Sequence, residues 1–119
     1  MAQLSGFFIF MNYPVPCICK KIKNKSAFVS VPGSKSITAR ALFIAALAKG
    51  TSTLYGAGLS DDCLTFIDCL KSLGIKVYLN GTTVTVEGCG GRLPVKSGEV
   101  YVGSAGTAAR FITALLAFS

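Results

Sequence analysis

The sequence lacks histidine and tryptophan, and it contains few acidic residues. Its 119 residues include 12 Lys+Arg against 5 Asp+Glu, which gives a net charge of +7. The absence of histidine removes the commonest nitrogen ligand for zinc. The excess of positive charge indicates an anionic partner, but charge alone does not choose among a nucleic acid, an anionic lipid and a phosphorylated or carboxylated small molecule.

The chain also lacks a disulfide framework, an export signal and a membrane-spanning run. Its five cysteines are an odd number at irregular spacings: Cys17, Cys19, Cys63, Cys69 and Cys89. The apolar segment 4–11 is too short to cross a bilayer, and no Lys or Arg precedes it. We therefore expect free thiols in the cytoplasm. Cys17 and Cys19 have no second pair to complete a zinc site, so we expect no metal and interpret them as one face of a strand.

About half of the residues are apolar and 14% are charged, which indicates one folded domain rather than disorder. Hydrophobic periodicity and turn residues predict helices near 35–49, 61–73 and 105–117. They predict strands near 17–22, 27–31, 51–56, 75–79, 82–87 and 99–102. The fold class is therefore α/β. From residue 27 the order is one βαβαββ unit, and 99–117 is interpreted as the start of a second.

Apolar spacing also predicts which faces are buried. On the first helix the expected face is Ile37, Ala41, Ile44, Ala45 and Ala48. On the second helix it is Cys63, Phe66, Ile67, Leu70 and Leu73. Val84 and Val86 share one face of a strand that follows Asn80-Gly81, a strong hairpin signal.

The segments before residue 34 differ from the rest. Residues 1–10 are interpreted as a leader or an extra strand, and 11–33 as N-terminal strands expected to pack with another domain. Residues 34–119 are interpreted as a partial domain that is cut short. Four lysines between residues 20 and 25 fit either a solvated edge strand or a phosphate-attracting patch.

The first motif with chemical content is VPGSKSITARA, residues 31–41. It places Lys35 at the start of a helix, where exposed N–H groups attract anions. Ser36 and Arg40 lie one turn apart, and a hydroxyl beside a guanidinium suits a carboxylate or phosphate. The segment is not a P-loop, because Ser34 precedes the lysine and the glycine spacing fails. A capped helix with a solvated Lys and Arg remains the alternative.

The second motif is VGSAGTAARF, residues 102–111. Its small residues allow close approach of a ligand to the backbone. Arg110 lies near the start of a helix, where the dipole disfavours positive charge, so we expect it to meet a ligand or an acidic residue. A tight packing turn is the alternative.

Together, PGSKSIT-x-R-A, then SDD, then GSAGTA-x-R resemble the EPSP synthase family over about residues 27–118. The resemblance implies transfer of the enolpyruvyl group of phosphoenolpyruvate to the 5-hydroxyl of shikimate 3-phosphate, without cofactor or metal. This reaction belongs to the route to chorismate and the aromatic amino acids. The implied fold is an inside-out α/β barrel with two domains, each built from three βαβαββ units.

The resemblance also implies roles for individual residues. Lys35 would be catalytic, reaching phosphoenolpyruvate and the reacting hydroxyl, and Ser36 with Arg40 would hold the shikimate carboxylate. The remaining implied substrate-binding positions are Asp62, Ser104, Gly106, Thr107 and Arg110. The Gly106 backbone would lie near the phosphate of phosphoenolpyruvate, in a turn shaped by Thr107. The chain departs from the family's common pattern at Ser104, where Asn is frequent, and at Phe111, where Pro or Leu is frequent.

Further residues that the family uses lie downstream of anything in this sequence. We therefore expect an N-terminal fragment that is inactive alone and that self-associates through exposed apolar surface. The expected partners are shikimate 3-phosphate and phosphoenolpyruvate, with no nucleic acid and no membrane. The alternatives are a non-catalytic anion- or nucleic-acid-binding module and the non-functional product of a truncated gene. Tyr78 and Tyr101 lie far from the Lys-rich segment, which disfavours nucleic acid.

Overall fold

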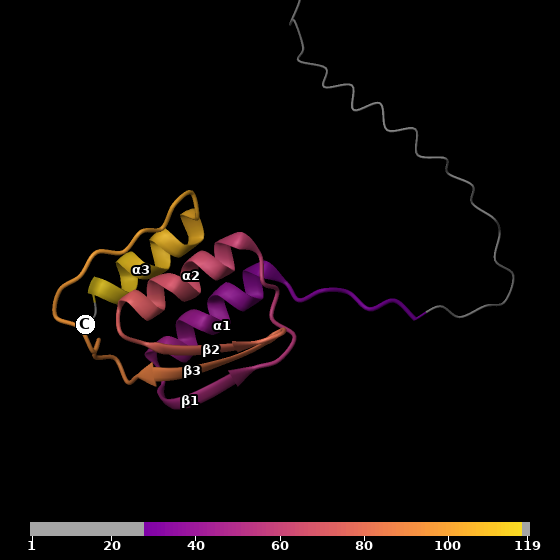
Figure 1. The fold of residues 1–119 in the computed structure, drawn as a ribbon, viewed down its shortest axis with the longest axis horizontal. Helices are drawn as coiled ribbons and strands as arrows, with labels where there is room; N and C mark the ends of the chain where they lie inside the picture. Colours follow the sequence, from indigo (N-terminus) through magenta and orange to yellow (C-terminus); the bar gives the residue numbers. More distant parts are fainter. Residues whose placement is uncertain (1–27, 118–119) are drawn as a thin grey trace, which may run out of the picture.

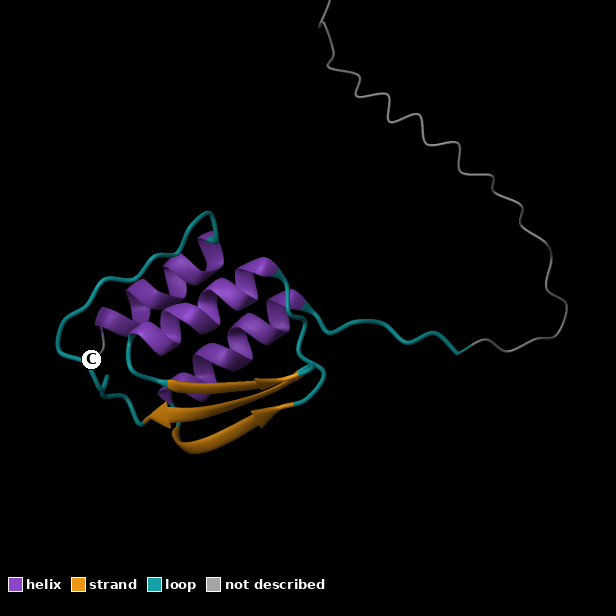
Figure 2. Cartoon of the chain, in the orientation of Figure 1, coloured by secondary structure: helices purple, strands orange, loops and turns teal. Residues whose placement is uncertain are grey.

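A computed structural model describes residues 28–117 as a small α/β domain (Figures 1 and 2). In chain order the elements are α1 (Lys35–Leu47), β1 (Lys49–Leu54), α2 (Asp61–Ser72), β2 (Lys76–Asn80), β3 (Thr83–Cys89) and α3 (Gly106–Ala117). Two helices, α1 and α2, lie on one face of a three-stranded sheet, and α3 packs against these two helices rather than against the strands.

The sheet has the order β1-β3-β2, and both strand pairs are antiparallel. The predicted hairpin at Asn80-Gly81 is confirmed, since it joins β2 to β3 and Gly81 has a φ of 56°. The shared face of the central strand is also confirmed, because Val84 and Val86 are fully buried beneath the helices. The central strand β3 therefore contributes the most deeply buried side chains of the sheet to the hydrophobic core.

The second helix follows its sequence pattern closely. All five residues of the predicted stripe are buried, with exposures of 2% or less: Cys63, Phe66, Ile67, Leu70 and Leu73. Two acidic residues occupy its first turn, and Gly74, with a φ of 82°, follows its last turn. The ring of Phe111 on α3 lies 5.0 Å from Phe43 and 5.8 Å from Phe66, so aromatic contacts tie the three helices together.

The predicted buried face of α1 is wrong except at Ala45, which is buried as expected. Ile37 is 70% exposed and Ile44 is 66% exposed, whereas Leu42 is fully buried. The residues that α1 does bury are Thr38, Ala39, Leu42, Ala45 and Ala46. The helix is apolar around almost its whole circumference, so spacing alone could not select the face that meets the sheet.

Two predicted strands are also wrong within the described residues. Residues 28–31 form no strand, and Phe28 is fully exposed; residues 99–102 form no strand either. A strand needs a neighbouring strand to satisfy its ladder, and residues 28–117 offer none at either place. The described order is therefore αβαββα. The strand expected near 17–22, with Cys17 and Cys19 on one face, lies outside the described residues.

The three cysteines that the structure describes are free thiols, as expected: Cys63, Cys69 and Cys89. Burial raises the pKa of the Cys69 thiol, whose Sγ donates to the Tyr101 carbonyl at 3.5 Å. Between residues 28 and 117, no helix is long and apolar enough to cross a membrane.

Candidate functional site

The three helices run in the same direction, so their N-terminal ends lie at the same end of the helical layer (Figure 1). These ends begin at Lys35, Asp61 and Gly106. Each leaves unpaired backbone N–H groups and the positive end of a helix dipole. The fold therefore brings both sequence motifs and the acidic start of α2 to one electropositive end.

The first turn of α1 is held against the segment that leads into α2. A Cβ placed on Gly33 would lie 2.0 Å from the Gly56 oxygen, and one on Gly58 would lie 2.2 Å from the Gly33 oxygen. Only glycine fits this backbone crossing. Beside it, Thr38 Oγ1 accepts a 2.8 Å hydrogen bond from the Gly58 N–H. One turn into α2, the Cys63 thiol donates to the Lys35 carbonyl at 3.6 Å.

This junction brings Lys35 and Asp62 together in an ion pair between Nζ and Oδ2. The Lys35 side chain is 54% exposed and that of Asp62 is 31% exposed. The hydrogen bond to Asp62 raises the pKa of Lys35 above its ordinary value, with the Asp62 charge adding to the effect. Lys35 is therefore an ammonium at neutral pH, and two of its three N–H donors remain for another anion.

Ser36 and Arg40 are also in contact, as their spacing of one turn predicts. Arg40 Nη1 donates to the Ser36 carbonyl at 2.9 Å and also to the Ser36 hydroxyl oxygen. Both side chains are exposed. The contact leaves the serine O–H and the remaining guanidinium N–H groups available, which is a donor set suited to a carboxylate.

The loop before α3 carries the second group of predicted residues. Gly103 turns the chain with a φ of 52°, and the Gly106 N–H donates to the Ser104 carbonyl at 3.0 Å. Thr107 and Arg110 are exposed on the first turns of α3. All five acidic residues of the chain lie within residues 28–117, and none of them pairs with Arg110 there. No hydrogen bond or ion pair in this part of the chain joins the loop to Lys35 or Arg40.

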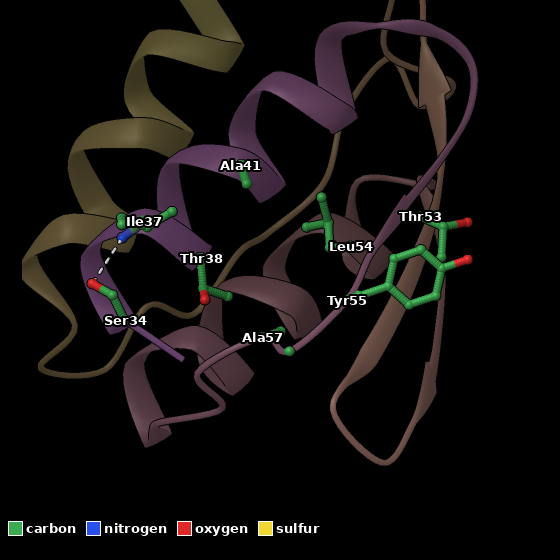
Figure 3. A pocket seen from close by; sticks show the side chains of 9 residues that line it. Ser34, Ile37, Thr38, Ala41, Thr53, Leu54, Tyr55 and Ala57 are labelled. Carbon is green, nitrogen blue, oxygen red and sulfur yellow. Dashed lines mark hydrogen bonds between the residues drawn. The ribbon is translucent and has the colours of Figure 1, made fainter. Parts of the chain in front are cut away.

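Two cavities flank the junction without containing its charges. One, of about 360 Å³, lies between α1 and the end of β1 and is mainly lined by apolar groups, including Ile37, Leu54 and Tyr55 (Figure 3). The other, of about 470 Å³, lies between segments 30–33 and 56–59 and is also lined by Thr82. The charged groups therefore form an open surface rather than an enclosed pocket.

Within residues 28–117, no group of three His, Cys, Asp or Glu side chains gathers at one place. The donors at the helix ends are ammonium, guanidinium, hydroxyl and backbone N–H groups. Such donors suit the oxygens of anions.

The sequence interpretation missed Thr38 and the position of Cys63 beside Lys35. Thr38 is 5% exposed and is the one polar residue between 28 and 117 that is buried as a whole. The sequence does carry a signal for the burial of Thr38, because this residue shares helical spacing with Leu42 and Ala45 on the buried face. The contact with Gly58 joins residues that are 20 positions apart, so no local pattern could have indicated it.

Comparison with known proteins identifies the family. The family model described as EPSP synthase (3-phosphoshikimate 1-carboxyvinyltransferase) matches residues 19–119. A 3-phosphoshikimate 1-carboxyvinyltransferase of Trichormus variabilis is 54% identical over 93 residues, which cover 76% of this chain and 22% of that protein. The protein of the same name from Nostoc sp. is 53% identical over the same coverage.

Solved structures agree with the sequence relatives. The structure of EPSP synthase from Acinetobacter baumannii superimposes with a TM-score of 0.68 at 28% identity, covering 74% of this chain and 20% of that one. The chain thus spans about a fifth of the length of the relatives it matches. With a family match over most of its residues, this chain belongs to the EPSP synthase (3-phosphoshikimate 1-carboxyvinyltransferase) family.

Proposed function

We propose that this chain supplies one anion-binding side of an enolpyruvyl transferase that acts on phosphoenolpyruvate and shikimate 3-phosphate. The observation that carries the proposal is the gathering of three helix N-termini at one end of the domain, with Lys35 and the Ser36–Arg40 pair on the first turns of α1. Both substrates carry phosphate and carboxylate groups, so this set of donors matches their chemistry.

Each predicted residue has a role in the proposal. Ser36 and Arg40 hold the shikimate carboxylate by hydroxyl and guanidinium donation. The Gly106 backbone lies close to the phosphate of phosphoenolpyruvate in a turn shaped by Thr107, and Ser104 borders that turn. Arg110, which has no acidic partner among residues 28–117, adds a second guanidinium for the same anion.

Lys35 acts as a cation, whose ammonium is held beside the Asp62 carboxylate by their ion pair. In the transfer, the 5-hydroxyl oxygen bonds to C2 of phosphoenolpyruvate and gives up its proton, while a proton is added at C3 and the C2–C3 double bond becomes a single bond. The resulting tetrahedral intermediate then loses phosphate, together with a proton from C3. An ammonium beside the reacting groups stabilises the negative charge that moves onto the phosphate oxygens.

The 119 residues alone are proposed to bind anions without turnover. The relatives are about five times longer than the matched region, and two highly charged substrates need more donors than the motifs of this chain provide. The αβαββ order from α1 to β3 is proposed to be one repeat of the inside-out α/β barrel. The free thiols fit a reducing cytoplasm.

The test is an NMR titration of the isotope-labelled chain with shikimate 3-phosphate and then with phosphoenolpyruvate. Resonance shifts should concentrate on the first turns of α1 and α3, and Lys35→Ala and Arg40→Ala should reduce them. Lys96→Ala and Arg92→Ala are matched controls, because both residues are exposed and lie in the loop before α3.

Two outcomes would contradict the proposal. One is a set of shifts spread evenly over all exposed lysines and arginines. The other is preferential binding of single-stranded DNA with a steep dependence on salt concentration, which would favour a nucleic-acid-binding module. A phosphate-release assay on the same sample should show no shikimate-dependent turnover.

A further inference from the structure

Thr38 connects the two segments that carry the charged residues of the site. It lies one turn after Lys35 on α1, and its side chain is 5% exposed. Its hydroxyl oxygen accepts the Gly58 N–H at 2.8 Å. The Gly58 carbonyl in turn accepts the N–H of Ser60, the N-cap residue of α2, at 3.1 Å. A short chain of hydrogen bonds therefore runs from α1 to the start of the helix that carries Asp62.

The other contacts at this junction constrain the backbones less specifically. At the crossing, the backbones of Gly33 and Gly58 are in van der Waals contact. This contact limits how close the two segments come, but it does not fix their orientation as a hydrogen bond would. The thiol of Cys63 reaches the Lys35 carbonyl at 3.6 Å, and sulfur is a weak donor. The Thr38–Gly58 bond is short and partly buried, and the low local dielectric strengthens such a bond.

We propose that Thr38 is a positioning residue, whose buried hydroxyl fixes the start of α2 against α1 and thereby sets where Asp62 holds the Lys35 ammonium. Thr38 itself touches no substrate. Its importance for catalysis rests on the proposed function of Lys35, whereas its effect on the geometry does not.

Thr38 can affect the position of Asp62 because the segment between Gly58 and Asp62 is short. Asp62 lies four residues after Gly58, and the Lys35 ammonium sits at the end of a flexible side chain that is 54% exposed. A long exposed side chain keeps one position only when a partner holds it there. If the Gly58 N–H loses its acceptor, the segment before α2 can shift and the carboxylate no longer faces Lys35 in one fixed geometry.

The test makes two comparisons in the full 119-residue chain: the wild type with Thr38→Val, and Thr38→Ser with Thr38→Ala. Thr38→Val replaces the hydroxyl by a methyl group of similar shape. Thr38→Ser and Thr38→Ala both lack the γ-methyl group and differ only in the hydroxyl. Thr113→Val is the matched control, because Thr113 is an exposed helical threonine whose hydroxyl bonds only to the Ala109 carbonyl, at 2.8 Å.

Two readouts are taken without ligand: hydrogen exchange of the Gly58 amide and the pKa of Lys35 followed through its labelled side-chain carbon. In the Val and Ala variants we expect Gly58 exchange to accelerate by roughly tenfold or more, since it loses a buried acceptor. The pKa of Lys35 should fall toward its ordinary value in the same variants. Thr38→Ser and Thr113→Val should leave both readouts as in the wild type.

The proposal is overturned if folded Val and Ala variants keep the wild-type pKa of Lys35, or if Thr38→Ser behaves as Thr38→Ala does. Loss of the fold in both the Val and Ala variants would also overturn it, because the hydroxyl would then serve folding rather than placement. If only Thr38→Val fails to fold, the Ser and Ala pair decides. Failure of the wild type to bind either substrate would refute the proposed function and leave these ligand-free results standing.

Discussion

Substituting Gly58 by alanine tests the backbone crossing that joins the two halves of the candidate site. The new Cβ would lie 2.2 Å from the Gly33 oxygen and 3.1 Å from the Lys35 nitrogen, whereas an ordinary contact is 3.4–4 Å. The two segments must therefore separate by more than about 1 Å. Because both near atoms belong to backbone, no side-chain rotation can relieve the overlap.

The cost has two parts. Overpacking in a close-packed region typically costs about 1–3 kcal/mol. Separation also weakens the Thr38–Gly58 hydrogen bond, and a buried group that loses its partner costs about 1–3 kcal/mol more. We expect Gly58→Ala to lower the free energy of unfolding by about 2–6 kcal/mol, a large part of the roughly 5–15 kcal/mol of a typical domain.

Urea denaturation measures this change, with unfolding followed by circular dichroism and the midpoint converted through the slope. Gly98→Ala is the matched control, because a Cβ there meets nothing within 4 Å and its backbone is not in the left-handed region. A Gly58→Ala variant as stable as Gly98→Ala, within about 0.5 kcal/mol, would refute the close crossing.

Three further predictions concern the ion pair, the buried face of α1 and its exposed face. Because Asp62 raises the pKa of Lys35 above its unfolded value of 10.5, the pair stabilises the fold below that pH and the contribution is lost as pH rises through the folded pKa. Urea midpoints measured from roughly pH 9 to 12 should therefore fall more in the wild type than in Lys35→Met. An equal fall with pH in the two proteins would argue against the pair. Leu42→Ala should lower the free energy of unfolding in urea by about 2–5 kcal/mol, whereas Ile44→Ala should change it by no more than about 0.5 kcal/mol. A larger loss for Ile44→Ala than for Leu42→Ala would show that the face expected from spacing is the buried one. The exposed Ile37 and Ile44 should drive self-association detectable by light scattering, and the double change to lysine should reduce it; a monomeric wild type would contradict this.

The sequence predicted best where polar and apolar residues alternate sharply. In α2, charged residues separate the apolar ones, so only one face could be buried and the stripe from Cys63 to Leu73 was correct. The Asn80-Gly81 turn fixed the register of β2 and β3 for a similarly local reason. Local chemistry was enough wherever it allowed one solution.

Prediction failed where the outcome depended on a partner distant in sequence. The apolar residues of α1 allow several faces, and only the packing against β3 and α2 selects Leu42 over Ile44. Residues 28–31 and 99–102 have strand-like composition, but pairing decides strand formation and the described residues supply no neighbour.

The candidate site shows the same division between local and distant interactions. The Ser36–Arg40 contact lies within one helical turn and follows from the spacing of the motif. The Lys35–Asp62 ion pair, in contrast, requires α1 and α2 to pack with their N-termini together. Family resemblance indicated that both residues border one pocket, but no periodicity could have indicated their direct contact.

Calorimetric titration of the chain with shikimate 3-phosphate tests whether the N-terminal ends of the helices form an anion site. We expect saturable binding at one site per chain, weakened about tenfold in Arg40→Ala. A lost charge-assisted hydrogen bond is worth about 1.5–3 kcal/mol, and exposure to solvent reduces that figure. Arg92→Ala, which removes an exposed arginine outside both motifs, should bind as the wild type does. Equal affinities for the Arg40→Ala and Arg92→Ala variants, or no binding by the wild type, would contradict the assignment of an anion site to the N-terminal ends of the helices.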